Sequence, residues 1–348
     1  MQILKKCSSM KFRHRVLLSL LMLTGAAMAQ AKERNIEIRT AIDSKYLFCE
    51  VKTNGVPGYD NRASALRGEG AGTTSTNSYI AMSNGANELT VEVGSLDWFA
   101  ENAAELENKE KFNPAAYCKA VMTLVDYDNR QTVNLATLDI RINQQGLPEA
   151  YLNNEPDKTA IFKKITSHPT ERVTKNKATS GNITPRAYPD NMTLYQFTQP
   201  FTVSDLPDWQ WVHSEPYTGS PEQIALLKEA YSELWLALKN KDIKKVRKLH
   251  TPAAESWAIT TRSTAEEILD SQRYNTIYDE KNAEMKTIDW GNFYIIPMNN
   301  GKMVRMVYKE NLRFSPVGIS YIDSDGDKSS YFFSPIFSLV NGKYIPVI

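Results

Sequence analysis

Short segments of alternating apolar and polar residues, closed by tight-turn dipeptides, recur along the chain, and this pattern most restricts its possible folds. Asn-Gly or Asp-Gly dipeptides stand beside such segments at five places: 54–55, 84–85, 300–301, 325–326 and 341–342. These dipeptides adopt the positive φ angles of two-residue β-hairpins at little cost. Because the segments do not alternate regularly with helices, we expect antiparallel rather than parallel sheets.

Residues 32–215 contain mainly these segments and are predicted to form an antiparallel β-sandwich. The alternation is clearest at Leu89, Val91 and Val93. We expect a mobile Gly-, Ser- and Thr-rich loop at 63–76, a helical or loop insertion at 102–111, and a polar linker or insertion at 168–191. The predicted strands are 35–42, 46–52, 78–82, 87–93, 116–126, 132–142 and 191–203.

Residues 220–348 begin with helical patterns and end with hairpins, which predicts an α+β domain after the sandwich. Ser220 and Gln223 form a predicted capping box around Pro221 at the first helical position. A second helix is expected at about 242–250, a third from 251–252, and another capping box at 263–266. The predicted strands are 293–298, 303–308, 312–322, 330–340 and 343–348.

Residues 79–91 resemble the strand–turn–strand of jelly-roll, galactose-binding-like domains, in which a Gly-x-Asn turn precedes an alternating strand. Here the turn is Gly85-Ala86-Asn87. The resemblance implies a β-sandwich that could bind a sugar, with Trp98 as a candidate aromatic contact. The same turn is common hairpin chemistry in any β-domain, and Trp98 could instead pack in a core or an interface.

Residues 220–348 resemble the cystatin-like α+β roll of the NTF2-like superfamily. The features that carry the resemblance are the opening helices, the antiparallel hairpins and the closing strand 336–340 with its Asn341-Gly342 turn. The resemblance implies a pocket between helices and a curved sheet. The candidate binding residues for that pocket are His250, Trp257, Tyr274 and Tyr278.

Each of these residues also has a structural interpretation. His250 would end a basic helix, where its charge favours the helix dipole. Tyr274 and Tyr278 are four residues apart and would pack along one helical face. No set of residues matches the catalytic patterns of the superfamily, so no catalytic residue is predicted.

Trp209 and Trp211 are separated by one polar residue and would point to the same face of a strand. We expect them to form a wedge that packs the two domains together. The alternative is a pair of aromatic side chains that forms a binding platform.

The first 29 residues are interpreted as a cleaved signal peptide that directs the protein to the periplasm. Five basic residues precede a short apolar core, 16–27, and Ala27-Met28-Ala29 is a typical cleavage site. The core is too short for a permanent anchor, so no membrane span is expected after cleavage. Translation could begin at Met1 or at Met10.

Two cysteines, Cys49 and Cys118, remain after cleavage and are predicted to form a disulfide between two sandwich strands. Two buried free thiols are the alternative. The leader carries five of the 41 basic residues and none of the 40 acidic ones, which leaves a net charge of about −4. This charge argues against a nucleic-acid partner.

The sequence shows no Ser–His–Asp order, metal-ligand cluster or phosphate loop, so no metal or cofactor is predicted. The first hypothesis is a non-catalytic periplasmic protein-binding protein, for example an immunity or inhibitor protein that neutralises a secreted toxin. The second is an envelope carbohydrate-binding module. The third is a small-molecule enzyme that uses the pocket of the C-terminal domain.

Overall fold

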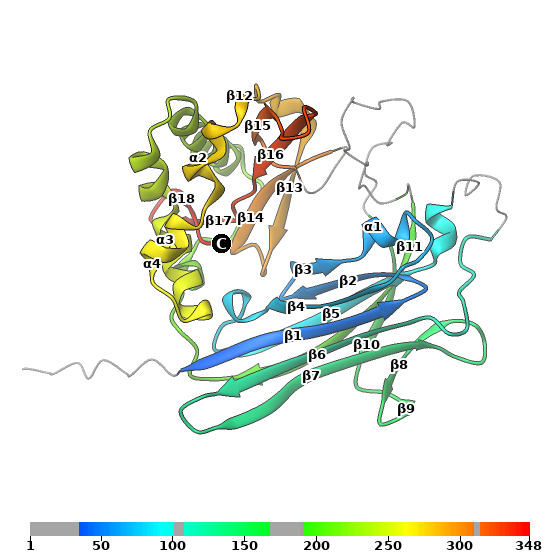
Figure 1. Cartoon of the computed structure of the whole chain (residues 1–348). Helices are drawn as coiled ribbons and strands as arrows, with labels where there is room; N and C mark the ends of the chain where they lie inside the picture. Colours follow the sequence, from blue (N-terminus) through cyan, green and yellow to red (C-terminus); the bar gives the residue numbers. More distant parts are fainter. Residues whose placement is uncertain (1–34, 101–107, 168–188, 190, 310–313) are drawn as a thin grey trace, which may run out of the picture. The chain divides into compact units, whose positions relative to one another are not determined.

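The computed structural model describes residues 35–100, 108–167, 189, 191–309 and 314–348 (Figure 1). These residues belong to one compact unit, Arg34–Ile348. The predicted signal peptide and most of the polar segment 168–191 lie outside the described residues. The predicted α+β class is confirmed, with sheets that pair antiparallel throughout the described chain. None of the helices in this part is long and apolar enough to cross a membrane.

Two antiparallel sheets form a β-sandwich-like N-terminal part. Their strand orders are β4-β1-β6-β7-β8-β9 and β10-β11-β5-β2-β3. The polar segment 168–191 connects β10 to β11, which pair directly with each other. The elements are β1 (Ile36–Lys45), β2 (Phe48–Thr53), β3 (Val56–Asp60), α1 (Arg62–Ala65), β4 (Gly72–Asn77), β5 (Gly85–Gly94), β6 (Tyr117–Asp126), β7 (Gln131–Ile142), β8 (Pro148–Leu152), β9 (Glu155–Pro156), β10 (Ile161–Thr166) and β11 (Thr193–Val203).

The sandwich core follows from the alternation of side chains along each strand. Val51, Val91 and Phe197 lie directly opposite one another on β2, β5 and β11, and all three are buried. Their neighbours along the strands therefore point to the outer face of the sheet. Cys49 on β2 and Cys118 on β6 form a disulfide with Cα atoms 6.3 Å apart. The predicted disulfide is confirmed, and it joins the two sheets.

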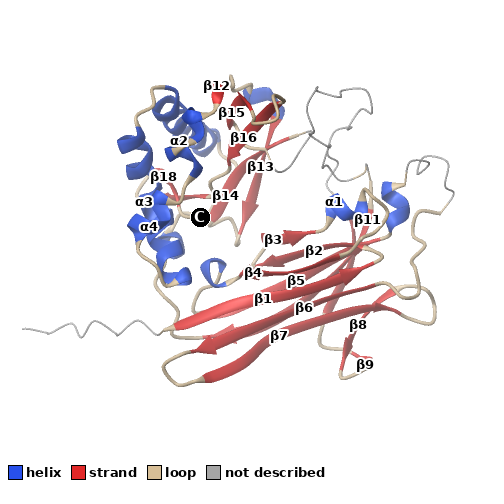
Figure 2. Cartoon of the chain, viewed as in Figure 1, coloured by secondary structure: helices blue, strands red, loops and turns tan. Residues whose placement is uncertain are grey.

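The C-terminal part contains the long helices and seven further strands of the described chain. Figure 2 distinguishes its helices in blue from its strands in red. Its strands form two sheets of orders β12-β15-β16 and β13-β14-β17-β18. The helices are α2 (Pro221–Lys239), α3 (Ile243–Thr261) and α4 (Ala265–Asp270). The strands are β12 (Lys281–Met285), β13 (Phe293–Met298), β14 (Met303–Tyr308), β15 (Val317–Ile322), β16 (Lys328–Phe333), β17 (Phe337–Val340) and β18 (Lys343–Pro346).

Strand β14 contributes to two cores because its side chains alternate between the faces of its sheet. Val304 and Met306 belong to the cluster that the helices cover, together with Tyr231 of α2. Met303 belongs to the sandwich cluster, as does Met298 of β13. The two parts therefore share buried apolar side chains. The division into separate domains at 215–220 stays a prediction.

Four of the five turn dipeptides join paired strands, as predicted. Asn54 and Gly55 have φ values of 50° and 75° and connect Thr53 to its partner Val56. The dipeptide at 84–85 does not, because residues 79–81 form a 3₁₀ turn where a strand was predicted. Residues 63–76, expected to be a loop, contain part of α1 and all of β4 except Asn77.

Three further strand predictions need correction. The sequence pattern missed β9 and β10, whose residues are mostly exposed and therefore lack a clear apolar alternation, and it also missed the short strand β8, in which only Pro148 and Ala150 are buried. The segment 330–340 is broken between β16 and β17 at Pro335, which cannot donate a ladder hydrogen bond. The strand predicted at 312–322 begins only at Val317, and residues 312–313 lie outside the described part.

Helix α3 runs through Pro252, so the predicted helix boundary at residues 250–252 is wrong. A proline inside a helix removes one backbone hydrogen bond and costs about 3 kcal/mol. The helix continues because residues on both sides of Pro252, including Val246 and Ala254, bury their side chains in the same apolar cluster. Packing of one face thus outweighs the local preference.

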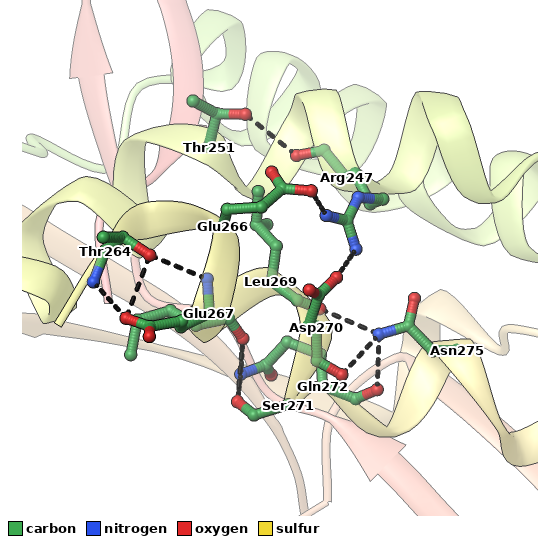
Figure 3. Close-up of polar contacts among 11 residues, drawn as sticks. Arg247, Thr251, Thr264, Glu266, Glu267, Leu269, Asp270, Ser271, Gln272 and Asn275 are labelled. Atoms are coloured by element: carbon green, nitrogen blue, oxygen red, sulfur yellow. Dashed lines mark hydrogen bonds and ion pairs between the residues drawn. The ribbon is translucent and has the colours of Figure 1, made fainter.

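The start of α4 is capped one residue later than predicted (Figure 3). Thr264 caps the helix by accepting the Glu267 N–H at 3.2 Å, while the Glu267 carboxylate accepts the Thr264 N–H at 2.8 Å. Glu266 is left to pair with Arg247 of α3, which also binds Asp270 at 2.8 Å. These ion pairs link α4 to α3 at the surface.

Candidate functional site

A cleft of 730 Å³ lies between the outer face of the second sandwich sheet and strands β13 and β14. Glu50 and Lys52 on β2 and Glu92 on β5 line one side. Arg305 on β14 and Ile296 on β13 line the other. The volume lies within the range of roughly 300–1,000 Å³ that is typical of ligand sites.

Strand alternation places the charged side chains in this cleft. Val51 points into the sandwich core, so its neighbours Glu50 and Lys52 point outward. Glu50 lies directly opposite Glu92 in the register of β2 and β5. Two like charges in this position would repel each other unless cations separated them.

Two cations lie next to these carboxylates. Lys52 Nζ is 2.8 Å from a Glu92 carboxylate oxygen and 3.8 Å from a Glu50 oxygen. Arg62 Nη2 is 3.2 Å from the same Glu50 oxygen, and Gln196 donates to Glu92 at 2.8 Å. Glu50, Arg62 and Glu92 are each only 4% exposed. Because a buried charge that loses its partner is strongly destabilising, this network holds the floor of the cleft in one arrangement.

Burial also changes the proton affinities of these groups. Burial raises the pKa of the Glu50 carboxyl above 4.5, and the positive charges of Lys52 and Arg62 oppose this effect. Burial alone would lower the pKa of Lys52, but the charges of Glu50 and Glu92 outweigh it and raise that pKa. The network therefore favours a charged lysine between two carboxyl groups.

Arg305 differs from Lys52 and Arg62 because its donors are unused. Its Nε is buried without a hydrogen-bond partner, and the guanidinium makes no ion pair among the described residues. Burial lowers its pKa, and the nearby charges of Tyr231 and Glu50 act in the opposite direction. An arginine stays protonated in proteins, so a cation with free donors lines this side of the cleft.

The structure places Trp209 and Trp211 in the buried core rather than in the cleft. Trp209 is 3% exposed and donates its Nε1–H to the Met82 carbonyl at 2.7 Å, and Trp211 is 1% exposed and donates to the Ile80 carbonyl at 3.1 Å. Their segment forms a 3₁₀ turn over 210–213 and not a strand. Their burial agrees with the expected packing wedge and leaves little surface for a binding platform.

The candidate residues of the C-terminal pocket are engaged in packing. His250 Nδ1 lies 3.0 Å from the Val246 carbonyl inside α3, so this histidine is not helix-terminal as predicted. Burial lowers its pKa, against the effect of that carbonyl. The ring of Tyr274 lies 5.5 Å from the His250 ring, and Tyr274 is only 1% exposed.

Tyr274 and Tyr278 lie on two successive 3₁₀ turns, 273–275 and 277–279, instead of one helical face. The Tyr278 hydroxyl donates to the Leu238 carbonyl at the end of α2. Burial raises the pKa of each tyrosine to about 12. Trp257 is half-buried on α3. A binding role for these side chains stays a prediction.

Trp98 lies on a 3₁₀ turn beside the apolar cluster that contains Phe48, Met192 and Leu194. Lys109 stacks over its ring, with Nζ 5.0 Å from the centroid. The structure thus places the candidate sugar-contact residue in local packing, and a binding role for it also stays a prediction.

The sequence did not reveal the charged residues of the cleft as site residues. Alternation of Glu50 and Lys52 around Val51 is typical of any strand with one solvated face. These charges differ from ordinary surface charges only because β13 and β14 lie over this face of the sheet. Within the described ranges, no group of three or more His, Cys, Asp or Glu side chains is arranged to hold a metal ion.

Comparisons of this chain with protein-family models, with curated proteins and with solved structures find no match.

Proposed function

We propose that this protein is an exported, non-catalytic binding protein that holds part of a periplasmic protein partner in the charged cleft. A secreted toxin that the protein neutralises is the partner class that we favour. The observation that carries the proposal is the paired network of Glu50, Lys52, Arg62 and Glu92 beneath the unpaired Arg305. Such a pre-arranged polar site suits recognition, because little ordering is needed when a ligand binds.

The composition of the cleft supports binding over catalysis. Its described lining holds no His, Cys or Ser side chain that could act as a base or nucleophile. Its two deeply buried carboxylates, Glu50 and Glu92, each contact a cation. The predicted periplasmic location belongs to this proposal, and the disulfide supports it, since such bonds persist in oxidising compartments.

A small-molecule enzyme is the second candidate function, and one observation favours it. Glu50 has a raised pKa and lies opposite Glu92, as in sites where one carboxyl acts as an acid and another as a base. In that case the chemistry would occur in the cleft and not around His250. A sugar ligand in the same cleft is the binding alternative.

We also propose that residues 220–348 are an NTF2-like roll and that the sandwich is of jelly-roll type. The order of long helices followed by antiparallel hairpins supports the first assignment. The division of the seven C-terminal strands between two sheets differs from a single curved sheet.

The test is an affinity pull-down from periplasmic extract and culture supernatant, with the chain from Gln30 as bait. A cleft-filling variant, Thr198→Trp, is compared with Thr123→Trp as a matched control. Thr198 lines the cleft, whereas Thr123 is a half-buried residue on β6 of the other sheet.

One stoichiometric protein that binds the wild type and Thr123→Trp but not Thr198→Trp would support the proposal. Capture that is equal for both variants would place the partner elsewhere on the protein. No captured protein, together with turnover or binding of a small molecule, would reject the proposal in favour of the alternatives. Circular dichroism of both variants checks that each one is folded.

A further inference from the structure

Arg305 is the feature of the cleft that the internal network leaves unused. Lys52 and Arg62 are both committed to Glu50 or Glu92, whereas the Arg305 guanidinium has no hydrogen-bond or ion-pair partner in the described chain. A guanidinium in a partly buried site gains most from an anion that accepts two parallel hydrogen bonds. A ligand anion would therefore complete the structure at Arg305, whose Nε is buried, whereas the other unpaired cation of the described lining, Lys163, is exposed.

We propose that the cleft binds the C-terminal carboxylate of a partner polypeptide and that Arg305 is the residue that pairs with it. This inference rests on the proposed function and specifies which part of the partner is recognised. The carboxylate would form a bidentate pair with Arg305, and the residues preceding it would lie along the sheet. Arg305 is thus assigned as a binding residue.

The charges around Arg305 favour a carboxylate over a phosphate. Glu50, Asp60, Glu88 and Glu92 all line the same cleft. A phosphate group with nearly two negative charges would be repelled by these carboxylates, and the lining cations without an ion pair in the described chain are Arg305 and the exposed Lys163. A carboxylate carries a single charge, and its planar geometry matches that of one guanidinium.

The other lining residues suit a short stretch of polypeptide. Thr90 and Thr198 on the sheet offer hydroxyl groups, while Ile161, Ile296 and Pro297 offer apolar contacts. Such mixed lining can contact both the backbone and the side chains of a peptide. A chain end brings a single strand of polypeptide into the cleft, whereas an internal Asp or Glu would bring chain on both sides of it.

The experiment is an NMR titration of the protein from Gln30 labelled with ¹⁵N-arginine, which reports the Nε–H signal of each arginine. The probes are acetyl-trialanine with a free C-terminal carboxylate, the same peptide with a C-terminal amide, and inorganic phosphate. The signal that disappears in Arg305→Lys identifies Arg305. Arg273, which is ion-paired with Glu280 outside the cleft, serves as the internal control.

We expect the Arg305 signal to shift and saturate with the free acid while the Arg273 signal stays in place. The amide should bind at least about tenfold more weakly, because charged hydrogen bonds are lost. An equal response to acid and amide, or no response to either, would overturn the inference. A larger response to phosphate than to the acid would also overturn it and identify a phosphate site.

The pull-down separates this inference from the proposed function. A partner that binds the wild type and Arg305→Gln equally well, but not Thr198→Trp, would keep the proposed function and reject the role of Arg305. A saturating response of Arg305 to the free acid without any captured protein would keep the carboxylate site and reject the protein partner. Arg305→Lys keeps the charge without the bidentate geometry, so we expect it to bind the acid more weakly than the wild type.

Discussion

Removal of the Cys49–Cys118 bridge should lower the stability of the whole sandwich. The bridge joins strands from opposite sheets and closes a loop with a sequence separation of 69 residues. Loop-closure entropy for that length gives a loss of about 4 kcal/mol at 25 °C for the double variant Cys49→Ala, Cys118→Ala. Both cysteines are fully buried, so small cavities left by the missing sulfur atoms add to this loss.

The assay is urea unfolding followed by tryptophan fluorescence, with the oxidised wild type, the reduced wild type and the double variant compared. Trp209 and Trp211 are buried in the same apolar cluster as both cysteines and report its exposure. We expect the urea concentration at the unfolding midpoint to be lower for the reduced wild type and for the double variant than for the oxidised wild type. A loss of less than about 1 kcal/mol would refute the reasoning, since it would lie far below the range for native disulfides. Labelling of both thiols before reduction would show that the bridge does not form.

Three further predictions concern the C-terminal part, and urea unfolding measures each one. Burial lowers the pKa of His250 below 6.5, so at low pH the unfolded chain binds a proton more readily than the folded chain does. The free energy of unfolding should therefore fall as the pH drops below 6.5, and it should fall less in His250→Gln. Thr264→Ala should cost about 1 kcal/mol through loss of the α4 cap, and an unchanged midpoint would contradict this. Gly301→Ala and Gly326→Ala both place alanine at positive φ, but only the first brings a Cβ within 3.2 Å of the Tyr217 backbone, so it should cost more. Equal losses of stability in the two variants would show that the Tyr217 backbone moves away from the new Cβ at no cost in free energy.

Local sequence patterns predicted much of the secondary structure because hairpin turns and alternating strands depend on neighbouring residues. The turns at 54–55 and 341–342 connect paired strands as expected. The failures occur where packing overrides local preference. Pro252 remains inside α3 because both halves of the helix bury the same face. The residues next to Pro252 do not indicate this burial.

The sequence by itself determined the antiparallel β-rich α+β class and the pairing of the only two cysteines left after the predicted signal peptide. Only the tertiary structure decided that Glu50, Lys52 and Glu92 are site residues. Side-chain alternation assigns these residues to an outer face of the sheet. The alternation is the same whether that face is in contact with water or covered by another sheet. Strands β13 and β14, more than 200 residues away along the chain, cover that face and bring Arg305 to it. Contacts so distant in sequence leave no local pattern, so the cleft could not be predicted.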